Sequence, residues 1–105
     1  MNRGDVCWYT FKASDKKRPV LILTGEFAIS VLNSVTIAPI TSTIRSIPTE
    51  LLLTEQDGVP DICAANFDNL QTVPKSNIGD RITRLTSRRM KEAAAAVSFA
   101  LGLDE

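Results

Sequence analysis

One helical pattern dominates the C-terminal end of the chain, and it limits what the rest can fold into. Five apolar residues recur there at steps of three and four, the period of one helical face: Met90, Ala93, Ala94, Val97 and Leu101. Thr86 or Ser87 can cap this helix, and Gly102 can end it. No crossover helices separate the strand-like runs before it, as parallel strands would require. The pattern therefore predicts an antiparallel sheet with a C-terminal helix.

The runs that precede the helix have the length and composition of short strands. Residues Pro19 to Thr24 are almost continuously apolar, which predicts a central strand buried on both faces. Further strands are expected at Val6–Phe11, Val35–Ile40, Thr49–Leu53, and at Ile62–Phe67 with Leu70–Val73 as one bent strand or two short ones. We expect a loop at Lys12–Arg18, a helical turn at Phe27–Leu32 and a tight turn at Gln56–Gly58. The predicted fold class is mainly β: a small SH3-like antiparallel barrel or half-barrel with a C-terminal α-helix.

The length of 105 residues is that of one domain, covering residues 1–105. Ala95, Ala96 and Phe99 lie outside the helical stripe, so the apolar surface of the helix is wider than one packing face requires. Two explanations are open at this point. A second copy of the chain uses the surplus, or a small β core wraps far around an alanine-rich helix.

Charge is balanced in total but segregated along the chain. The formal net charge is zero, which argues against a protein that coats nucleic acid through bulk charge. Residues 50–68 carry five acidic side chains and no basic one, whereas residues 71–91 carry six basic side chains and a single acid, Asp80. A smaller basic cluster of Lys16, Lys17 and Arg18 precedes the central strand. It is either a local phosphate site or a solvated loop.

Several kinds of site are excluded by what the sequence lacks. It contains no histidine, which excludes catalytic schemes built on imidazole. Neither a metal site nor a cofactor is predicted, because there is no CxxC spacing, no acidic pair at metal-ligand spacing and no glycine-rich phosphate loop. Cys7 and Cys63 are expected to be buried free thiols. Without an apolar signal core or membrane span, the protein is expected to be cytoplasmic.

Hydroxyl and guanidinium groups stand where strands are expected to begin or end. Arg18 precedes Pro19, and a polar segment follows Ile40: Thr41, Ser42, Thr43 and Arg45. Arginine presents a planar fork of donors that suits phosphate, and hydroxyls both donate and accept. These residues would suit phosphodiester recognition. From spacing alone, an arginine that only begins a strand and a simple turn remain as alternatives.

The chain resembles the MazF/PemK toxin family at ordered points along nearly its whole length. These points are residues 3–6 (Arg-Gly-Asp-Val) with Trp8, residues 18–20 (Arg-Pro-Val), residues 35–45, residues 48–50 (Pro-Thr-Glu), residues 66–73, residues 78–85, and the alanine-rich helix ending at residues 100–103. The resemblance implies an SH3-like barrel of the CcdB/PemK type, a homodimer and a cognate antitoxin partner. It further implies cleavage of single-stranded RNA at short sequence motifs.

The resemblance also implies roles for individual residues. The family's principal catalytic residues correspond to Arg18, before the proline of the second strand, and Thr41, at the end of the third strand. The groove that binds RNA would then be lined by Ser42, Thr43, Arg45, Asp68 and Asn69, with Lys16 and Lys17 available for phosphate contacts.

Such a site needs no metal, because the ribose 2′-OH of RNA attacks the adjacent phosphorus and leaves a cyclic phosphate and a 5′-OH. Arg18 would stabilise the charge on phosphorus, and Thr41 would position a phosphate oxygen or the 2′-OH. The general base is not identified, because arginine stays protonated and a threonine hydroxyl is a very weak acid. Asp68 is a candidate by chemistry alone.

The sequence also departs from the family pattern. The loop before Arg18 is shorter than the usual one, which often holds a Gly-Ser-Glu element, and Gln71 stands where an arginine is common. Because that loop normally helps to close over the RNA, the sequence motif that is cut is not predicted. Two rival functions are kept: a CcdB-like toxin that binds a DNA topoisomerase, and an inactive SH3-like interaction module.

Overall fold

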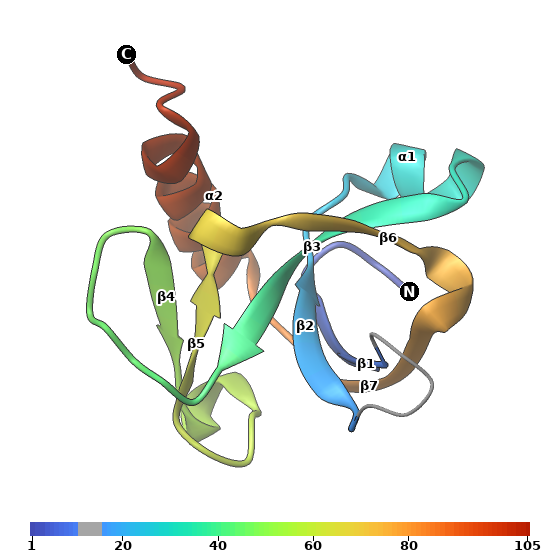
Figure 1. The fold of residues 1–105 in the computed structure, drawn as a ribbon, viewed down its shortest axis with the longest axis horizontal. Coiled ribbons are helices and arrows are strands. Elements are labelled where there is room, and N and C mark those ends of the chain that lie inside the picture. The colour runs from blue at the N-terminus through green and yellow to red at the C-terminus, as the bar shows by residue number, and fades with distance from the viewer. Residues whose placement is uncertain (11–15) are drawn as a thin grey trace.

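The computed structural model describes residues 1–10 and 16–105, and in these residues the chain is mainly β (Figure 1). The strands are β1 (Asp5–Tyr9), β2 (Arg18–Ile22), β3 (Ser34–Thr41), β4 (Glu50–Leu53), β5 (Cys63–Asn66), β6 (Gln71–Pro74) and β7 (Ile78–Arg84). The α-helices are α1 (Glu26–Val31) and α2 (Ser87–Leu101), and three short 3-10 helices are η1 (Glu55–Asp57), η2 (Phe67–Asn69) and η3 (Lys75–Asn77). The predicted extension of β1 to Phe11 and the loop residues 12–15 lie outside the described residues.

The strands form one antiparallel sheet in the order β4-β5-β3-β2-β1-β7. β3 is the longest strand, and it pairs β6 along Ser34–Ile37 and β5 at Ile40 and Thr41. The SH3-like antiparallel architecture is confirmed, but the ladder of the described residues does not close into a barrel, because β4 and β7 remain at the two ends of the path. The open alternative for residues 62–73 is decided in favour of two short strands, with η2 between them.

β2 is buried on both faces, as its apolar run predicts. Leu21 belongs to one buried cluster together with Val6 and Phe67, whereas Val20 and Ile22 belong to a second cluster on the other face of the strand. Successive side chains of a strand point to opposite faces, so both clusters draw on this one segment. The prediction of a central strand is therefore confirmed.

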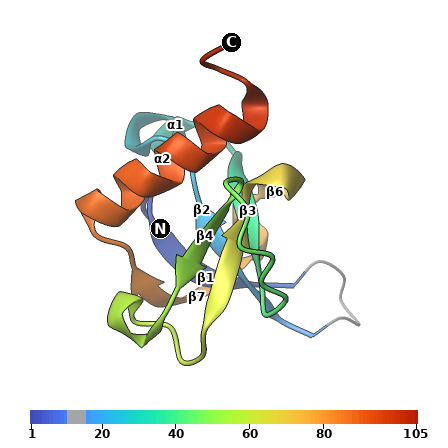
Figure 2. The same cartoon turned by 90° about the vertical axis from the view of Figure 1, so that its left-hand side faces the viewer.

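Helix α2 covers the first cluster, and its ends lie where the sequence predicts (Figure 2). The Thr86 side chain accepts a hydrogen bond from the Arg89 amide (3.2 Å), and Gly102 ends the helix with a left-handed backbone (φ 67°). The predicted packing stripe is partly wrong: Ala96 is buried with Ala93, while Ala94 and Leu101 are exposed. An alanine-rich helix is apolar around much of its circumference, so periodicity alone does not specify the buried face.

Strand β7 has no counterpart among the predicted elements. Its sequence, Ile-Gly-Asp-Arg-Ile-Thr-Arg, is mostly polar and largely exposed. It pairs with β1 at the edge of the sheet, with shifts in register. Edge strands commonly carry charged side chains, so the alternation of apolar and polar residues does not identify them in a sequence. No helix of the described residues has both the length and the apolar character that crossing a bilayer requires.

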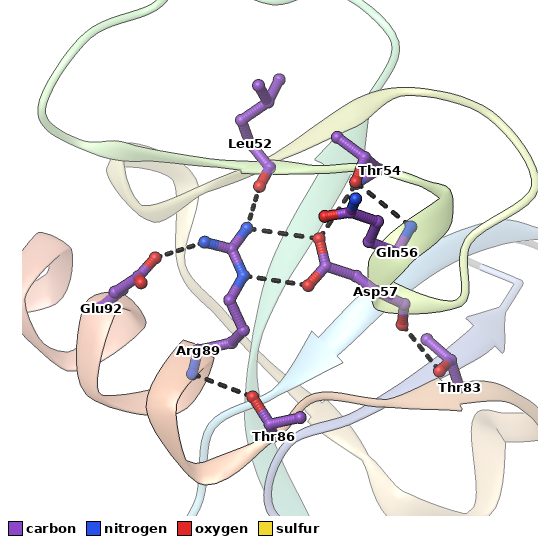
Figure 3. A network of polar contacts seen from close by, with 8 residues as sticks. All are labelled: Leu52, Thr54, Gln56, Asp57, Thr83, Thr86, Arg89 and Glu92. Carbon is purple, nitrogen blue, oxygen red and sulfur yellow. Dashed lines mark hydrogen bonds and ion pairs between the residues drawn. The ribbon is translucent and has the colours of Figure 1, made fainter.

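Side chains rather than a strand ladder join the two ends of the sheet (Figure 3). From α2, the Arg89 Nε donates to Asp57 Oδ1 (2.9 Å) in η1, and Arg89 also donates to the Leu52 carbonyl of β4. From β7, the Thr83 hydroxyl donates to the Asp57 carbonyl (2.9 Å). Asp57 therefore connects the β4 end of the sheet with β7 and α2.

Candidate functional site

Arg18 and Thr41 lie at the ends of neighbouring antiparallel strands. The ladder of β2 and β3 runs from Ile22↔Ile37 to Val20↔Pro39 and then stops. Beyond it, β2 stays paired with β1 through Tyr9↔Arg18, while β3 pairs with β5 through Thr41↔Ala64. The two strand ends diverge at the lower side of Figure 1. The divergence leaves space between Arg18 and Thr41.

A cavity of ≈ 440 Å³ occupies this space, which we call the Arg18–Thr41 cavity. Its volume is in the usual range for small-ligand sites. Its polar lining consists of Lys17, Arg18, Thr41, Ser42 and Asp61. Its remaining lining is largely apolar and comes from five parts of the chain: Trp8, Pro19, Pro39, Ile40, Val59, Pro60, Ile62, Cys63 and Ile82.

The Arg18 guanidinium is available for an anionic ligand. The side chain is exposed, and the ion pairs of the described residues involve Arg81, Arg84 and Arg89 instead. Lys17 lies beside it in the lining. Two cations that pair with no carboxylate of the described residues form a site where a phosphate group gains charge-assisted hydrogen bonds.

The Thr41 hydroxyl is oriented by its own loop. Thr41 Oγ1 accepts a hydrogen bond from the Thr43 amide (3.0 Å). This contact occupies an acceptor position of the oxygen and leaves its O–H free to donate. Thr43 therefore contributes to the site through its backbone.

The other predicted RNA-binding residues lie outside the lining of this cavity: Lys16, Thr43, Arg45, Asp68 and Asn69. Arg45 and Asp68 belong to a second polar group beside the start of β4. There the Arg45 amide donates to Glu50 Oε1 (3.0 Å), and the Thr49 hydroxyl donates to Asp68 Oδ2 (2.5 Å). The structure thus divides the predicted groove residues into two groups, and RNA contact by the second group stays a prediction.

Sequence reasoning missed the segment Val59–Cys63, which faces the two strand ends. Asp61 is exposed on this segment, and no periodicity or motif indicated that it lies near Arg18. Cys63 was expected to be buried but is only partly so, whereas Cys7 is buried as predicted. Burial, followed by the charges of Asp57 and Asp61, raises the pKa of the Cys63 thiol.

Trp8 is the aromatic member of the lining. Its position follows from the β1–β2 register, which pairs Trp8 with Pro19, the residue after Arg18. In the part of the chain that is described, no group of three or more cysteine and acidic side chains is placed to hold a metal ion. What the cavity offers is therefore cations, hydroxyls, one carboxylate and a broad apolar surface.

Residues 2–101 match the family model described as "PemK-like, MazF-like toxin of type II toxin-antitoxin system". The chain belongs to this family. Among curated PemK-like, MazF-like relatives, "Endoribonuclease MazF3" of Mycobacterium tuberculosis is 39% identical over 90 residues, covering 86% of this chain and 87% of the relative.

Solved structures agree with this assignment to the PemK-like, MazF-like family. "Mycobacterium tuberculosis toxin MazF-mt6" superposes with a TM-score of 0.86 at 35% identity, covering 96% of this chain and 99% of that one. An "Endoribonuclease in complex with its cognate antitoxin from Mycobacterial species" superposes with a TM-score of 0.85 at 27% identity, covering 98% and 96%. The predicted resemblance is thus confirmed, as is the prediction of a family of RNA-cleaving enzymes.

Proposed function

We propose that this protein is a toxin that cleaves single-stranded RNA at short sequence motifs in the cytoplasm, without a metal ion. The observation that carries the proposal is the Arg18–Thr41 cavity, where an arginine that pairs with no carboxylate in the described part of the chain and a free hydroxyl donor face the same space. Membership of a family whose curated relatives are named endoribonucleases supports it.

The proposed reaction uses the RNA's own nucleophile. The ribose 2′-oxygen loses its proton and bonds to the adjacent phosphorus, and the bond to the 5′-oxygen breaks. The leaving oxygen takes up a proton, so the products are a 2′,3′-cyclic phosphate and a 5′-OH end. Arg18 donates to the phosphate oxygens as negative charge accumulates, and the Thr41 hydroxyl fixes the phosphate or the 2′-OH.

An antitoxin is the proposed inhibitor. One similar mycobacterial endoribonuclease was solved in complex with its cognate antitoxin. For the present chain, an acidic, partly disordered antitoxin segment would pair with Lys17 and Arg18 and compete with RNA for the Arg18–Thr41 cavity. Inhibition would then fall as the RNA concentration rises.

A homodimer is proposed from the exposed apolar side chains of the two α-helices. Phe27, Val31 and Leu32 are exposed on and after α1, and Phe99, Leu101 and Leu103 are exposed at the end of α2. Both helices lie at the upper end of the two ribbon views, with α2 at the left and α1 at the right of Figure 1 (Figures 1 and 2). Exposed large apolar side chains mark interaction surfaces where they form a patch.

The test is cleavage of a long single-stranded RNA in EDTA, followed by mapping of the fragment ends. Wild type should give discrete fragments with 5′-OH ends, and Arg18→Ala should be slower by about 100- to 1,000-fold. Thr41→Val should lose activity to a similar degree, whereas Thr41→Ser should retain most of it because the hydroxyl remains. Lys91→Ala serves as the matched control, since Lys91 is an exposed cation of α2 that lies outside the lining.

The rival functions predict other outcomes. A topoisomerase-binding toxin would leave the RNA intact and stabilise DNA breaks in a gyrase assay. An inactive interaction module would do neither, and its expression would not arrest growth. Fragments formed equally by wild type and Arg18→Ala would point to a contaminating nuclease and contradict the proposal.

A further inference from the structure

Asp61 is the one carboxylate in the lining of the Arg18–Thr41 cavity. The structure shows no hydrogen bond or ion pair to its side chain from any described residue. It stands on the segment between η1 and β5, opposite the strand ends that carry Arg18 and Thr41. A carboxylate in a site for a polyanion repels phosphate. If Asp61 contacts the RNA, its partner is therefore a group other than phosphate.

The surface beside Asp61 suits a nucleobase. Trp8, Pro60 and Ile62 are among the apolar residues that line the cavity with it. Aromatic and apolar side chains form platforms on which bases stack, and the polar groups around such a platform decide which base fits. Lys17 and Arg18, in the same lining, provide for the phosphate that accompanies the base.

An ionised carboxylate only accepts hydrogen bonds, so it discriminates among bases by the donors they present. Cytosine, adenine and guanine each carry an exocyclic amino group, which donates to Asp or Glu oxygens in protein–nucleic acid complexes. Uracil has no amino group, and its single N–H is flanked by two carbonyl oxygens. A carboxylate facing that edge meets like charge on either side of the donor.

We propose that Asp61 is a specificity-determining residue, which accepts a hydrogen bond from the amino group of one base next to the scissile phosphate and disfavours uracil there. The inference rests on the proposed RNA cleavage. It assigns to Asp61 a recognition role and not that of the general base, because the carboxylate is grouped with apolar stacking surface and not hydrogen-bonded to Thr41 or Arg18.

The experiment compares wild type, Asp61→Asn and Asp80→Asn on a pool of RNAs with randomised sequence, in which every cut is mapped by sequencing. Asp80→Asn is the matched control, because it removes an exposed carboxylate that lines a different pocket. Wild type and Asp80→Asn should disfavour uracil at one position beside the cut by about 10- to 100-fold, the range of a hydrogen bond to a charged group. Asp61→Asn should reduce that discrimination to about threefold, since an amide also donates to uracil O4.

Binding gives an independent readout. Oligonucleotides that carry a 2′-deoxy sugar at the position of attack cannot react, and pairs that differ only by cytosine or uracil report the preference as a ratio of dissociation constants. Asp61→Asn should reduce that ratio. Thermal unfolding of both variants should match wild type, because Asp61 is exposed and makes no hydrogen bond that the substitution removes.

Two results would overturn the inference, and a third would overturn the proposed function alone. Unchanged base preference in Asp61→Asn, in both cleavage and binding, would show that Asp61 reads no base. Equal loss of cleavage at every sequence, with a flattened pH profile and unchanged binding ratios, would make Asp61 the general base. A wild type that binds the oligonucleotides with a base preference but cuts no RNA would refute the proposed function and leave the recognition role to stand on the binding ratio.

Discussion

The arginines of this protein fall into two groups by their partners. Arg84 and Arg89 donate to the carboxylates of Asp5 and Asp57, with nitrogen–oxygen distances of 2.7 and 2.9 Å. Arg18 makes no such pair among the described residues, although it lines a cavity that contains Asp61. An arginine that stabilises the fold donates its N–H groups to other residues of the protein, whereas an arginine that acts on a ligand leaves these N–H groups free.

The Cys63 thiol lines the same cavity, and the pH dependence of its alkylation rate measures the surroundings of the thiol. Its pKa lies above the ordinary value because of burial first, and then because of the charges of Asp57 and Asp61. The thiolate is the reactive form, so alkylation by iodoacetamide should be slow at neutral pH and should rise with a midpoint above that of a free cysteine. Mass spectrometry of the modified peptide measures this rate.

Asp61→Asn removes one of the charges that raise the pKa, and it should therefore shift the alkylation midpoint of Cys63 toward lower pH. A midpoint at or below the ordinary cysteine value in the wild type would contradict the environment described for Cys63.

Gly58 permits the turn that follows η1. Its φ of +93° is one that side chains rarely adopt, and an added Cβ would stand 2.2 Å from Thr83 Oγ1, the group that donates to the Asp57 carbonyl. Gly58→Ala should lower the free energy of unfolding by about 2 to 3 kcal/mol. Gly25→Ala is the control, because its Cβ meets nothing within 4 Å and its φ is −63°. Urea unfolding of both variants checks the difference.

Among the elements, the acidic segment 50–68 and the basic segment 71–91 interact with one another. The central contact joins Asp57 of η1 to Arg89 of α2, with side-chain exposures of 11% and 19%. Arg89 also donates to Glu92 and to the Leu52 carbonyl (Figure 3). The charge segregation in the sequence thus serves in part to join the ends of the open sheet, and the whole basic segment is not an RNA-binding surface.

Removing Arg89 should leave the Asp57 carboxylate largely buried without its cation. Arg89→Ala should therefore lower the free energy of unfolding by about 2 to 4 kcal/mol. A double-mutant cycle with Asp57→Asn should give a coupling energy of about 1 to 3 kcal/mol. Arg88→Ala, one position earlier and exposed, should change stability by less than about 0.5 kcal/mol. Equal effects at positions 88 and 89 would contradict the role given to this ion pair.

At the scale of the whole molecule, apolar surface remains uncovered after the sheet and α2 have packed. Phe99, near the end of α2, is 62% exposed and does not belong to the buried face of the helix, which Ala93 and Ala96 form. The two explanations for the wide apolar helix are thus partly resolved: Ala96 belongs to the core, whereas Phe99 is exposed. A second copy of the chain is the proposed partner.

The dimer is tested by sedimentation equilibrium. Wild type should have twice the 11.5 kDa mass of one chain, and Phe99→Glu should weaken the association by about tenfold or more. Leu52→Gln is the control, because Leu52 is also exposed (45%) but lies on the edge strand β4. A wild type that stays monomeric at high micromolar concentration would refute the proposed dimer.

Local features of the sequence determined several elements by themselves. The cap at Thr86, the end at Gly102 and the burial of Val20 to Ile22 depend on the identity of neighbouring residues, and the structure confirms each of them. The absence of histidine likewise excluded imidazole chemistry before any fold was known. The ordered motifs of residues 3–103 indicated the family, because their spacing is a property of the chain alone.

The composition of the site was decided only by the tertiary structure. β3 leaves β2 after Pro39 to pair with β5, and this divergence opens the cavity and brings the segment of Asp61 to face Arg18. Strand register and side-chain packing are non-local, so no pattern within residues 58–63 indicates which distant strand ends they approach. The buried face of α2 was undetermined for a related reason, since the alanine run in the middle of the helix offers several similar faces, and the positions of β4 and η2 select Ala93 and Ala96.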